Sequence, residues 1–79
     1  MAADISYEIT EHLGVFKNEK NGWTRELNKV SWNGKEAKYD IRNWDETHGK
    51  MSRGVTFDTI ELKNLYGILK TIFENESEI

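Results

Sequence analysis

The 79-residue chain contains no cysteine and no proline. Without cysteine, neither a disulfide nor a thiolate-bound metal can supplement a small hydrophobic core. Without proline or a low-complexity tract, no segment has the composition of a linker. We therefore expect a single domain over residues 1–79, with an ordered core at about 7–75 and loose tails at 1–6 and 76–79. A core of this size is small, so association with a second copy is its natural supplement.

The sequence also lacks long apolar runs. No segment approaches the ~20 apolar residues that a membrane-spanning helix needs. The first six residues show neither the basic region nor the apolar run of a secretory signal. We therefore expect a cytoplasmic protein with no membrane partner. Nine aromatic residues and a regular apolar periodicity argue against intrinsic disorder.

The net charge of −3 is unevenly distributed along the chain. Residues 1–16 and residues 54–79 are both acidic, each with a net charge of −3. Residues 17–53 carry nine lysines and arginines against six acidic residues. A local positive surface on an acidic protein is compatible with nucleic-acid binding, although it favours specific placement over broad attraction.

The dipeptide Asn33-Gly34 predicts a β-hairpin, because both residues tolerate the positive φ of a type I′ turn. Side chains alternate after this turn, as in a strand with two different faces. The face that we interpret as packing on the core carries Ala37, Tyr39 and Ile41. The opposite face, where burial does not require charge, carries Lys38, Asp40, Arg42 and Trp44.

Two strands are expected before this hairpin turn. The first covers residues 7–15, although Glu11 breaks its apolar series, so it begins either at Tyr7 or only near His12. A polar turn follows at residues 18–22. The second strand covers residues 23–32, and the parity of its apolar positions changes along it. Either a β-bulge near Asn28-Lys29 causes this change, or both faces of the strand are partly covered.

A short fourth strand is expected at residues 54–58, followed by a helix. Asp58 and Glu61 have the spacing of a capping box, which predicts a helix from about Thr59 to Glu74. The expected architecture is α+β: a curved four-stranded antiparallel sheet followed by one C-terminal helix. The helix has an apolar stripe, widened by Ile68 and formed by Leu62, Leu65, Tyr66, Leu69, Ile72 and Phe73. One sheet face cannot bury it all, which predicts an exposed patch and a homodimer interface.

Trp32, Arg42 and Trp44 form the sharpest candidate site. Base–aromatic stacking contributes roughly 1–3 kcal/mol per base, and arginine contributes phosphate contacts and stacking. The alternative is that the tryptophans cap the core and that Arg42 pairs with Asp40 or another acid. Further basic positions in this part of the chain are Lys17, Lys20, Arg25, Lys29, Lys35, Lys38, Lys50 and Arg53.

An enzymatic site has little support in the sequence. His12 and His48 are too few, and too far from other ligand types, to indicate a metal site. Asp40, Asp45 and Glu46 have no paired partner or nucleophile signature. No phosphate-cradling glycine loop, nucleophile elbow or zinc-protease motif is present. We therefore expect a non-enzymatic protein without a cofactor or metal.

Several motifs agree in order and spacing with one known family. They are Trp32-Asn-Gly-Lys35, Tyr39-Asp-Ile-Arg-Asn-Trp44 and Gly49-Lys-Met-Ser-Arg-Gly-Val-Thr-Phe57, followed by the predicted helix. Over about residues 12–75 the chain resembles the C-terminal domain of the transcriptional coactivator positive cofactor four, and especially its small bacterial members of the YdbC type. The resemblance implies a dimer whose grooves bind single-stranded DNA with little sequence preference.

The resemblance also implies roles for individual residues. Trp32 and Trp44 would stack on bases, Arg42 and Arg53 would meet phosphates, and Lys35 and Lys38 would contact the strand backbone. Arg25 and Lys29 are included as further candidate contacts because of their charge and position.

Two hypotheses of different kinds follow. In the first, the protein is a homodimeric binder of single-stranded DNA, or of RNA, that works with the transcription, replication or repair machinery as a regulator or coactivator. In the second, it is a protein-interaction module whose apolar helix face docks a partner helix or a polymerase subunit. The second hypothesis predicts a monomer that is indifferent to DNA.

Overall fold

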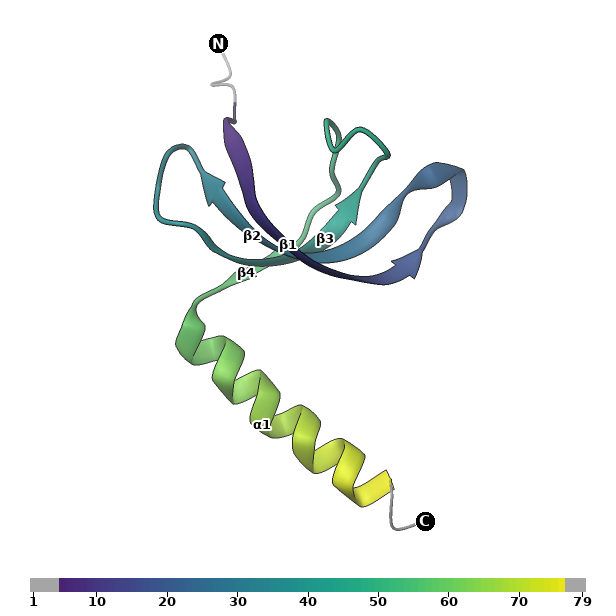
Figure 1. Cartoon of the computed structure of the whole chain (residues 1–79), viewed down its shortest axis with the longest axis vertical. Helices are drawn as coiled ribbons and strands as arrows, with labels where there is room; N and C mark the ends of the chain where they lie inside the picture. Colours follow the sequence, from purple (N-terminus) through teal and green to yellow (C-terminus); the bar gives the residue numbers. More distant parts are fainter. Residues whose placement is uncertain (1–4, 77–79) are drawn as a thin grey trace.

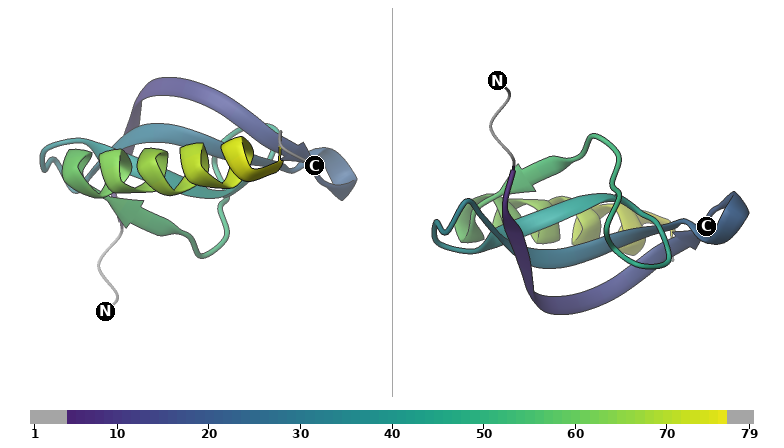
Figure 2. Two further views of the ribbon diagram at one scale, coloured as in Figure 1. Left: turned by 90° about the horizontal axis from the view of Figure 1, so that it is seen from below. Right: turned by 90° about the horizontal axis from the view of Figure 1, so that it is seen from above.

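The computed structural model describes residues 5–76 and forms one four-stranded antiparallel sheet followed by one helix (Figure 1). The strands are β1 (Tyr7–Asn18), β2 (Thr24–Trp32), β3 (Lys38–Trp44) and β4 (Val55–Phe57), and the helix is α1 (Thr59–Glu76). The strand order β1-β2-β3-β4 follows the chain. Seen from below, α1 lies across one side of the curved sheet (Figure 2). The predicted α+β architecture is confirmed.

The described part of the chain begins and ends within the tails that were predicted to be loose. Ser6 donates its backbone N–H to Asn33 Oδ1 at 3.0 Å, and its carbonyl accepts the Asn33 N–H at 2.7 Å. Glu76 is the last residue of α1. Residues 1–4 and 77–79 lie outside the described part, so the loose tails stay a prediction.

The turn between β2 and β3 has the predicted type I′ geometry. Asn33 and Gly34 have φ values of 53° and 74°, and Lys35 N–H donates to the Trp32 carbonyl at 3.0 Å. The turn between β1 and β2 contains a short 3₁₀ segment, η1 (Lys20–Gly22). Both hairpins are thus set by local turn chemistry.

Strand β1 begins at Tyr7 and continues to Asn18, so it is longer than the predicted strand. Its pairing with β2 shifts register between Ile9 and Glu11, between His12 and Gly14, and again between Val15 and Lys17. The pairing of β2 with β3 is continuous from Thr24 to Val30. The predicted bulge in β2 is therefore wrong, because the irregularities lie in β1 and account for the break in its apolar series.

The start of α1 confirms the predicted capping box. The backbone N–H of Asp58 donates to Glu61 Oε1 at 2.9 Å, and that of Glu61 donates to Asp58 Oδ1 at 2.8 Å. These two bonds satisfy donors that the helix cannot satisfy itself. They also fix the direction in which α1 leaves the short strand β4.

The most buried side chains lie on the sheet face opposite α1, which is not the face predicted as the core. They comprise Val30 and Trp44 with three polar residues, Glu26, Asn28 and Asp40. Tyr39 and Ile41, predicted as core residues, are only half-buried and face the helix. Strand β2 is covered on both faces, as the second interpretation of its pattern proposed. The N-terminal part of β1 and the β3–β4 loop rise on the side away from α1 (Figure 1).

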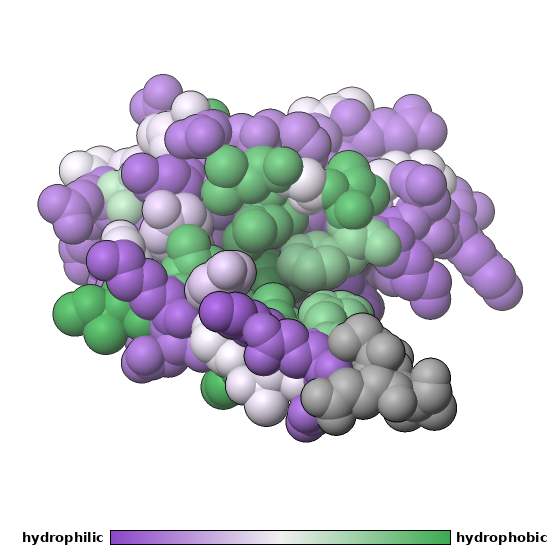
Figure 3. Space-filling model, turned by 60° about the horizontal axis from the view of Figure 1, so that its bottom comes forward, coloured by the Kyte–Doolittle hydropathy of each residue, from purple (hydrophilic) through white to green (hydrophobic). Residues whose placement is uncertain are grey.

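The space between α1 and the sheet is an open apolar groove of about 560 Å³. Figure 3 shows hydrophobic side chains gathered in this hollow. It is lined by Phe16, Leu27, Ile41, Phe57, Leu62, Leu65, Tyr66 and Leu69. Further along α1, Ile72 and Phe73 are also exposed. The predicted exposed apolar patch on the helix is therefore confirmed.

Candidate nucleic-acid interface

Arg42 lies at the centre of the sheet face opposite α1. Its Nε and Nη2 donate to the two carboxylate oxygens of Asp40, each at 2.7 Å. Its guanidinium carbon is 4.5 Å from the ring centroid of Trp32, so the cation rests against the indole. Asp40 and Arg42 are two residues apart on β3, so their side chains point to the same face of the sheet. The pairing of β3 with β2 places this face of β3 beside the face of β2 that carries Trp32.

The remaining bonds of Arg42 tie it to the β3–β4 loop. Its Nη1 donates to the Ser52 carbonyl at 3.3 Å and approaches Met51 Sδ at 3.5 Å. Gly54 packs so closely that an added Cβ would lie 2.5 Å from Arg42 Cβ. The Arg42 side chain is only 13% exposed. The structure thus supports the alternative in which Arg42 pairs with Asp40, because few of its donors remain for a phosphate.

Trp44, predicted to stack on a base, is completely buried. Its ring packs against Tyr7 at a centroid distance of 5.4 Å and against His48 at 5.7 Å. Tyr7 also packs against Trp32 at 5.7 Å. A stacking residue needs an exposed ring face, so in this conformation Trp44 supports the site from beneath. Trp32 is the half-buried aromatic that remains at the surface.

The β3–β4 loop is held by the carboxylate of Asp45. Asp45 Oδ1 accepts the backbone N–H groups of Lys50 and Gly49, both at 3.0 Å, and Thr47 Oγ1 donates to the same carboxylate. The backbone bond from Lys50 is the main reason why the pKa of Asp45 lies below its usual value, with smaller contributions from Thr47 and Gly49. This local turn presents the basic side chains of the loop to solvent.

Four basic side chains are exposed at the two ends of this face. Lys35 and Lys38 lie at the β2–β3 turn, and Lys50 and Arg53 lie in the β3–β4 loop. Within residues 5–76, none of the four forms an ion pair. Lys50 is a basic position of the sequence that was not among the predicted site residues, because its exposure depends on the fold of the loop. The four charges are free to meet an anion.

Arg25 and Lys29 lie on the opposite face of the sheet, with the helix. Arg25 Nε donates to Asn43 Oδ1 at 2.9 Å, and its guanidinium is 3.7 Å from Glu19. The ammonium group of Lys29 lies 5.5 Å from the ring centroid of Tyr39. The structure therefore does not bring these two predicted contacts together with Trp32 and the loop, because alternate residues of β2 point to opposite faces.

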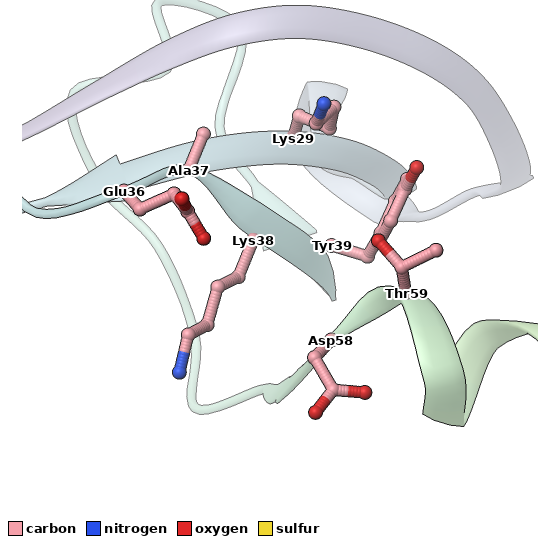
Figure 4. A pocket seen from close by; sticks show the side chains of 7 residues that line it. All are labelled: Lys29, Glu36, Ala37, Lys38, Tyr39, Asp58 and Thr59. Carbon is pink, nitrogen blue, oxygen red and sulfur yellow. The ribbon is translucent and has the colours of Figure 1, made fainter.

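Lys29 also lines a small cavity near the start of α1, of about 340 Å³ (Figure 4). Its lining consists of Lys29, Glu36, Ala37, Lys38, Tyr39, Asp58 and Thr59. Figure 4 shows the carboxylates of Glu36 and Asp58 among the lysines. Such a mixture of charges is poorly suited to a polyanion, so Lys38, at the start of β3, is the one residue of this lining that we keep in the candidate interface.

Sequence reasoning missed a polar cluster around Glu26, on the same face as Arg42. Glu26 is 3% exposed and accepts a hydrogen bond from Asn28 Nδ2 at 3.0 Å, another from Thr24, and a contact from His48 Nε2 at 2.9 Å. His12 Nδ1 lies 2.7 Å from Asn28 Oδ1. The alternation of side chains along β2 could have indicated this cluster, because Glu26 and Asn28 point to the same face of the strand as the apolar Val30.

The pKa of Glu26 reflects two opposing effects. Burial by itself raises the pKa of this carboxyl. Hydrogen bonds from Thr24, Asn28 and His48, together with the charge of His48, outweigh burial and lower the pKa below its usual value. Glu26 is therefore a buried anion at neutral pH, held by donors from two strands and a loop.

Within residues 5–76, no group of three or more histidine, cysteine or acidic side chains is arranged to hold a metal ion. In the same part of the chain, no helix is long and apolar enough to cross a membrane.

The chain is thus a small α+β domain with exposed cations on one sheet face. Comparison with known proteins shows which protein family it belongs to. A sequence model of the family described as "Transcriptional Coactivator p15 (PC4)" matches residues 19–68. A relative from Treponema pallidum (strain Nichols), described as "Uncharacterized protein", is 41% identical over 69 residues, which cover 87% of this chain and 81% of the relative. The chain belongs to the PC4 family of transcriptional coactivators. This family is one of nucleic-acid-binding, non-enzymatic proteins, and membership suggests, in general terms, binding of single-stranded DNA.

Proposed function

We propose that the protein binds single-stranded DNA with little sequence preference, as a homodimer and without enzymatic activity. Family membership carries this proposal, and the four exposed cations at the two ends of the sheet face that carries Trp32 support it. RNA is proposed as a second ligand, because phosphate contacts and base stacking do not distinguish single-stranded DNA strongly from RNA. A role as a transcriptional coactivator or regulator follows the family description, and a role in replication or repair would use the same binding.

We assign the contacts by exposure. Lys35 and Lys38 at the hairpin, with Arg53 in the loop, meet phosphates of the strand, because their charges are exposed and unpaired within the described chain. Trp32 offers a ring edge or face to a base. Arg42 and Trp44 hold Trp32 and the loop in place from beneath.

The phosphate contacts are tested by measuring single-strand affinity as a function of salt. Lys38→Ala should weaken binding about two- to fivefold and reduce the slope of log K against log salt by about 0.7. Lys35→Ala and Arg53→Ala should behave alike. Lys29→Ala is the matched control. Lys29 precedes Val30, the residue of β2 that pairs with Lys38, but its side chain lies on the helix side of the sheet. Equal effects of Lys38→Ala and Lys29→Ala would rule out the assigned face.

The stacking role is tested with Trp32→Leu. Loss of one stacked base should weaken binding roughly fivefold or more and leave the salt slope unchanged, because no phosphate contact is lost. Trp23→Leu, in the turn between β1 and β2, is the control. Affinity for a mixed-sequence single strand is read by fluorescence anisotropy, with the duplex as a comparison. A wild-type protein that binds neither ligand would refute the proposed function.

The homodimer is proposed to form at the apolar groove and the adjoining helix surface. A groove of about 560 Å³ with an almost purely apolar lining is unfavourable in water, and a second helix has the shape and chemistry to fill it. The proposed interface residues are Leu62, Leu65, Tyr66, Leu69, Ile72 and Phe73. Tyr66, at 67% exposed, shows how much apolar surface the single chain leaves uncovered.

The oligomeric state is measured by sedimentation or light scattering. Leu65→Asp should convert a dimer to a monomer, because it places a charge in the groove. Ile60→Asp is the control, because Ile60 is 70% exposed on the same helix but does not line the groove. A wild-type monomer that ignores DNA would instead favour a protein-interaction module that docks a partner in this groove.

A further inference from the structure

The two histidines of the chain flank a cavity of about 300 Å³, on the sheet face opposite α1. Ile9 and Glu26 complete its lining. His12 belongs to β1 and His48 to the β3–β4 loop, two segments that rise on the same side of the sheet (Figure 1). Their side chains are 53% and 38% exposed. The cavity is therefore open to solvent, with an imidazole on each side.

Each imidazole has one nitrogen held from within. Asn28 Nδ2 donates to Glu26, so the Asn28 oxygen faces His12 Nδ1 and accepts its proton at 2.7 Å. His48 Nε2 lies 2.9 and 3.0 Å from the two oxygens of Glu26, and it must donate because this carboxylate is ionised. The hydrogen-bond network thus fixes the tautomer of both neutral rings.

The outer nitrogens are His12 Nε2 and His48 Nδ1, and neither has a partner among residues 5–76. In the neutral rings these atoms carry lone pairs, which repel an anion. Protonation converts each into an N–H donor with a positive charge, while the inner bonds are kept. The ionised carboxylate of Glu26 lies 3.5 Å from His12 Nδ1 and 2.9 Å from His48 Nε2. The charge of the three-residue cluster then changes from −1 to +1.

We propose that His12 and His48 form a phosphate-binding subsite that becomes active when both rings are protonated, and that its ligand is a phosphodiester of the bound single strand. The inference rests on the proposed function. The subsite lies on the same sheet face as Arg42 and Trp32. It would add two contacts to those of Lys38 and Arg53 and make strand binding stronger as the pH falls through the range in which histidine usually titrates.

The elements that border the cavity carry other ionisable groups. They are Tyr7, Glu8, Glu11 and Lys17 on β1, Lys38, Asp40 and Arg42 on β3, and Asp45, Glu46 and Lys50 in the loop, whereas Arg25 and Lys29 of β2 lie on the helix side of the sheet. Arg42 faces Glu26 but is paired with Asp40. The Tyr7 hydroxyl donates to the His48 carbonyl. Carboxylates, lysine, arginine and tyrosine usually titrate outside the range from about pH 5.5 to 8, so a change within it reports the histidines.

The deciding experiment compares binding of labelled oligothymidylate at pH 5.5 and pH 8 at constant ionic strength. Thymine has no group that titrates in this range, so the DNA does not contribute. Wild-type affinity should rise about tenfold at the lower pH, as expected for two exposed ion pairs of roughly threefold each. His12→Gln/His48→Gln keeps all carboxylates and should show a much smaller rise. An equal rise in both proteins would overturn the inference.

A second measurement uses the wild-type protein alone and does not depend on DNA binding. The ring C–H signals of the two histidines are followed by NMR from pH 5 to 8, with and without inorganic pyrophosphate. Binding to the protonated rings should move both titration midpoints to higher pH. Unmoved midpoints would refute the phosphate subsite. If oligothymidylate fails to bind at either pH while the midpoints move, the proposed function fails and the phosphate subsite stands.

Discussion

The guanidinium of Arg42 and the carboxylate of Asp40 form a two-point ion pair beneath Trp32, with both N–O distances at 2.7 Å. Asp40 has no exposed surface, and Thr56 Oγ1 donates a third hydrogen bond to it at 3.0 Å. Planar, bidentate geometry fixes the orientation of a guanidinium as well as its position. Asp40 therefore determines where Arg42 can support both Trp32 and the β3–β4 loop.

Removal of this buried acid should be strongly destabilising. Asp40→Ala leaves the charge of Arg42 largely buried without its partner, and we expect a loss of about 3–5 kcal/mol in the free energy of unfolding. Chemical denaturation followed by tryptophan fluorescence measures this loss. Asp58→Ala is a matched control at an exposed helix cap and should cost only about 1 kcal/mol.

The double variant Asp40→Ala/Arg42→Ala measures the interaction between the two side chains separately from their other contacts. Because the double variant leaves no unpaired buried charge, its loss should be smaller than the sum of the two single losses by at least about 1 kcal/mol. Strict additivity, or an Asp40→Ala protein as stable as wild type, would contradict the central role given to this ion pair.

Gly54 should tolerate no side chain. A Cβ there would lie 2.4 Å from the Ile41 carbonyl and 2.5 Å from Arg42 Cβ, so the backbone must shift. We expect Gly54→Ala to lower the free energy of unfolding by about 1–3 kcal/mol, as in other overpacked sites. Gly14→Ala is the control, because no atom lies within 4 Å of the Cβ position there. Similar denaturation midpoints for the two variants would disprove the close packing of loop and strand.

Local chemistry made parts of this structure predictable. Asn33-Gly34 determines a type I′ turn by its backbone preferences alone, and Asp58 with Glu61 determines the start of α1 through two short-range hydrogen bonds. The exposed helix stripe followed from counting apolar positions. The placement of Arg42 beside Asp40 was one of two interpretations left open, because alternation shows which residues share a face but not what covers that face.

The deeper sheet face could not be predicted, because long-range folding buries it. β1 shifts register three times, and the β3–β4 loop folds back until His48 packs on Trp44. These events enclose a face that is rich in polar residues. Glu26 there accepts hydrogen bonds from Asn28 and His48, and Asp40 accepts them from Arg42 and Thr56, so neither carboxylate depends on water. The position of Arg25 and Lys29 on the helix side of the sheet could not be predicted for a related reason, since charge along a chain does not specify a sheet face.

The β3–β4 loop should loosen when its central carboxylate is removed. Asp45→Ala deletes the acceptor for the backbone N–H groups of Gly49 and Lys50, so their amide hydrogens should exchange faster with solvent. Thr47→Ala removes a side-chain donor to the same carboxylate and the second acceptor of the Gly49 N–H, so it should speed exchange at Gly49 but leave Lys50 nearly unchanged. NMR-detected exchange measures both. Unchanged exchange at these two amides in Asp45→Ala would show that the loop is held by other contacts.

The stability of the protein should decrease in acid through Glu26. The pKa of this carboxyl in the folded protein lies below its usual value of 4.5. A lowered folded pKa means that the stabilisation is complete above about pH 4.5 and is lost as the pH falls through the folded value. Glu26→Gln, which removes the charge, should cost about 1.5–3 kcal/mol at pH 7.

The cost of Glu26→Gln should therefore shrink as the pH is lowered below about 4.5, because the carboxyl takes up a proton more readily in the unfolded chain than in the folded protein. Urea denaturation of both proteins at several pH values gives the difference directly. Glu11→Gln, an exposed substitution on β1, is the control and should show little cost at any pH. A cost for Glu26→Gln that stays constant down to pH 3 would mean that the charge of Glu26 does not stabilise the fold, and that its hydrogen bonds from Asn28 and His48 act equally well on a neutral side chain.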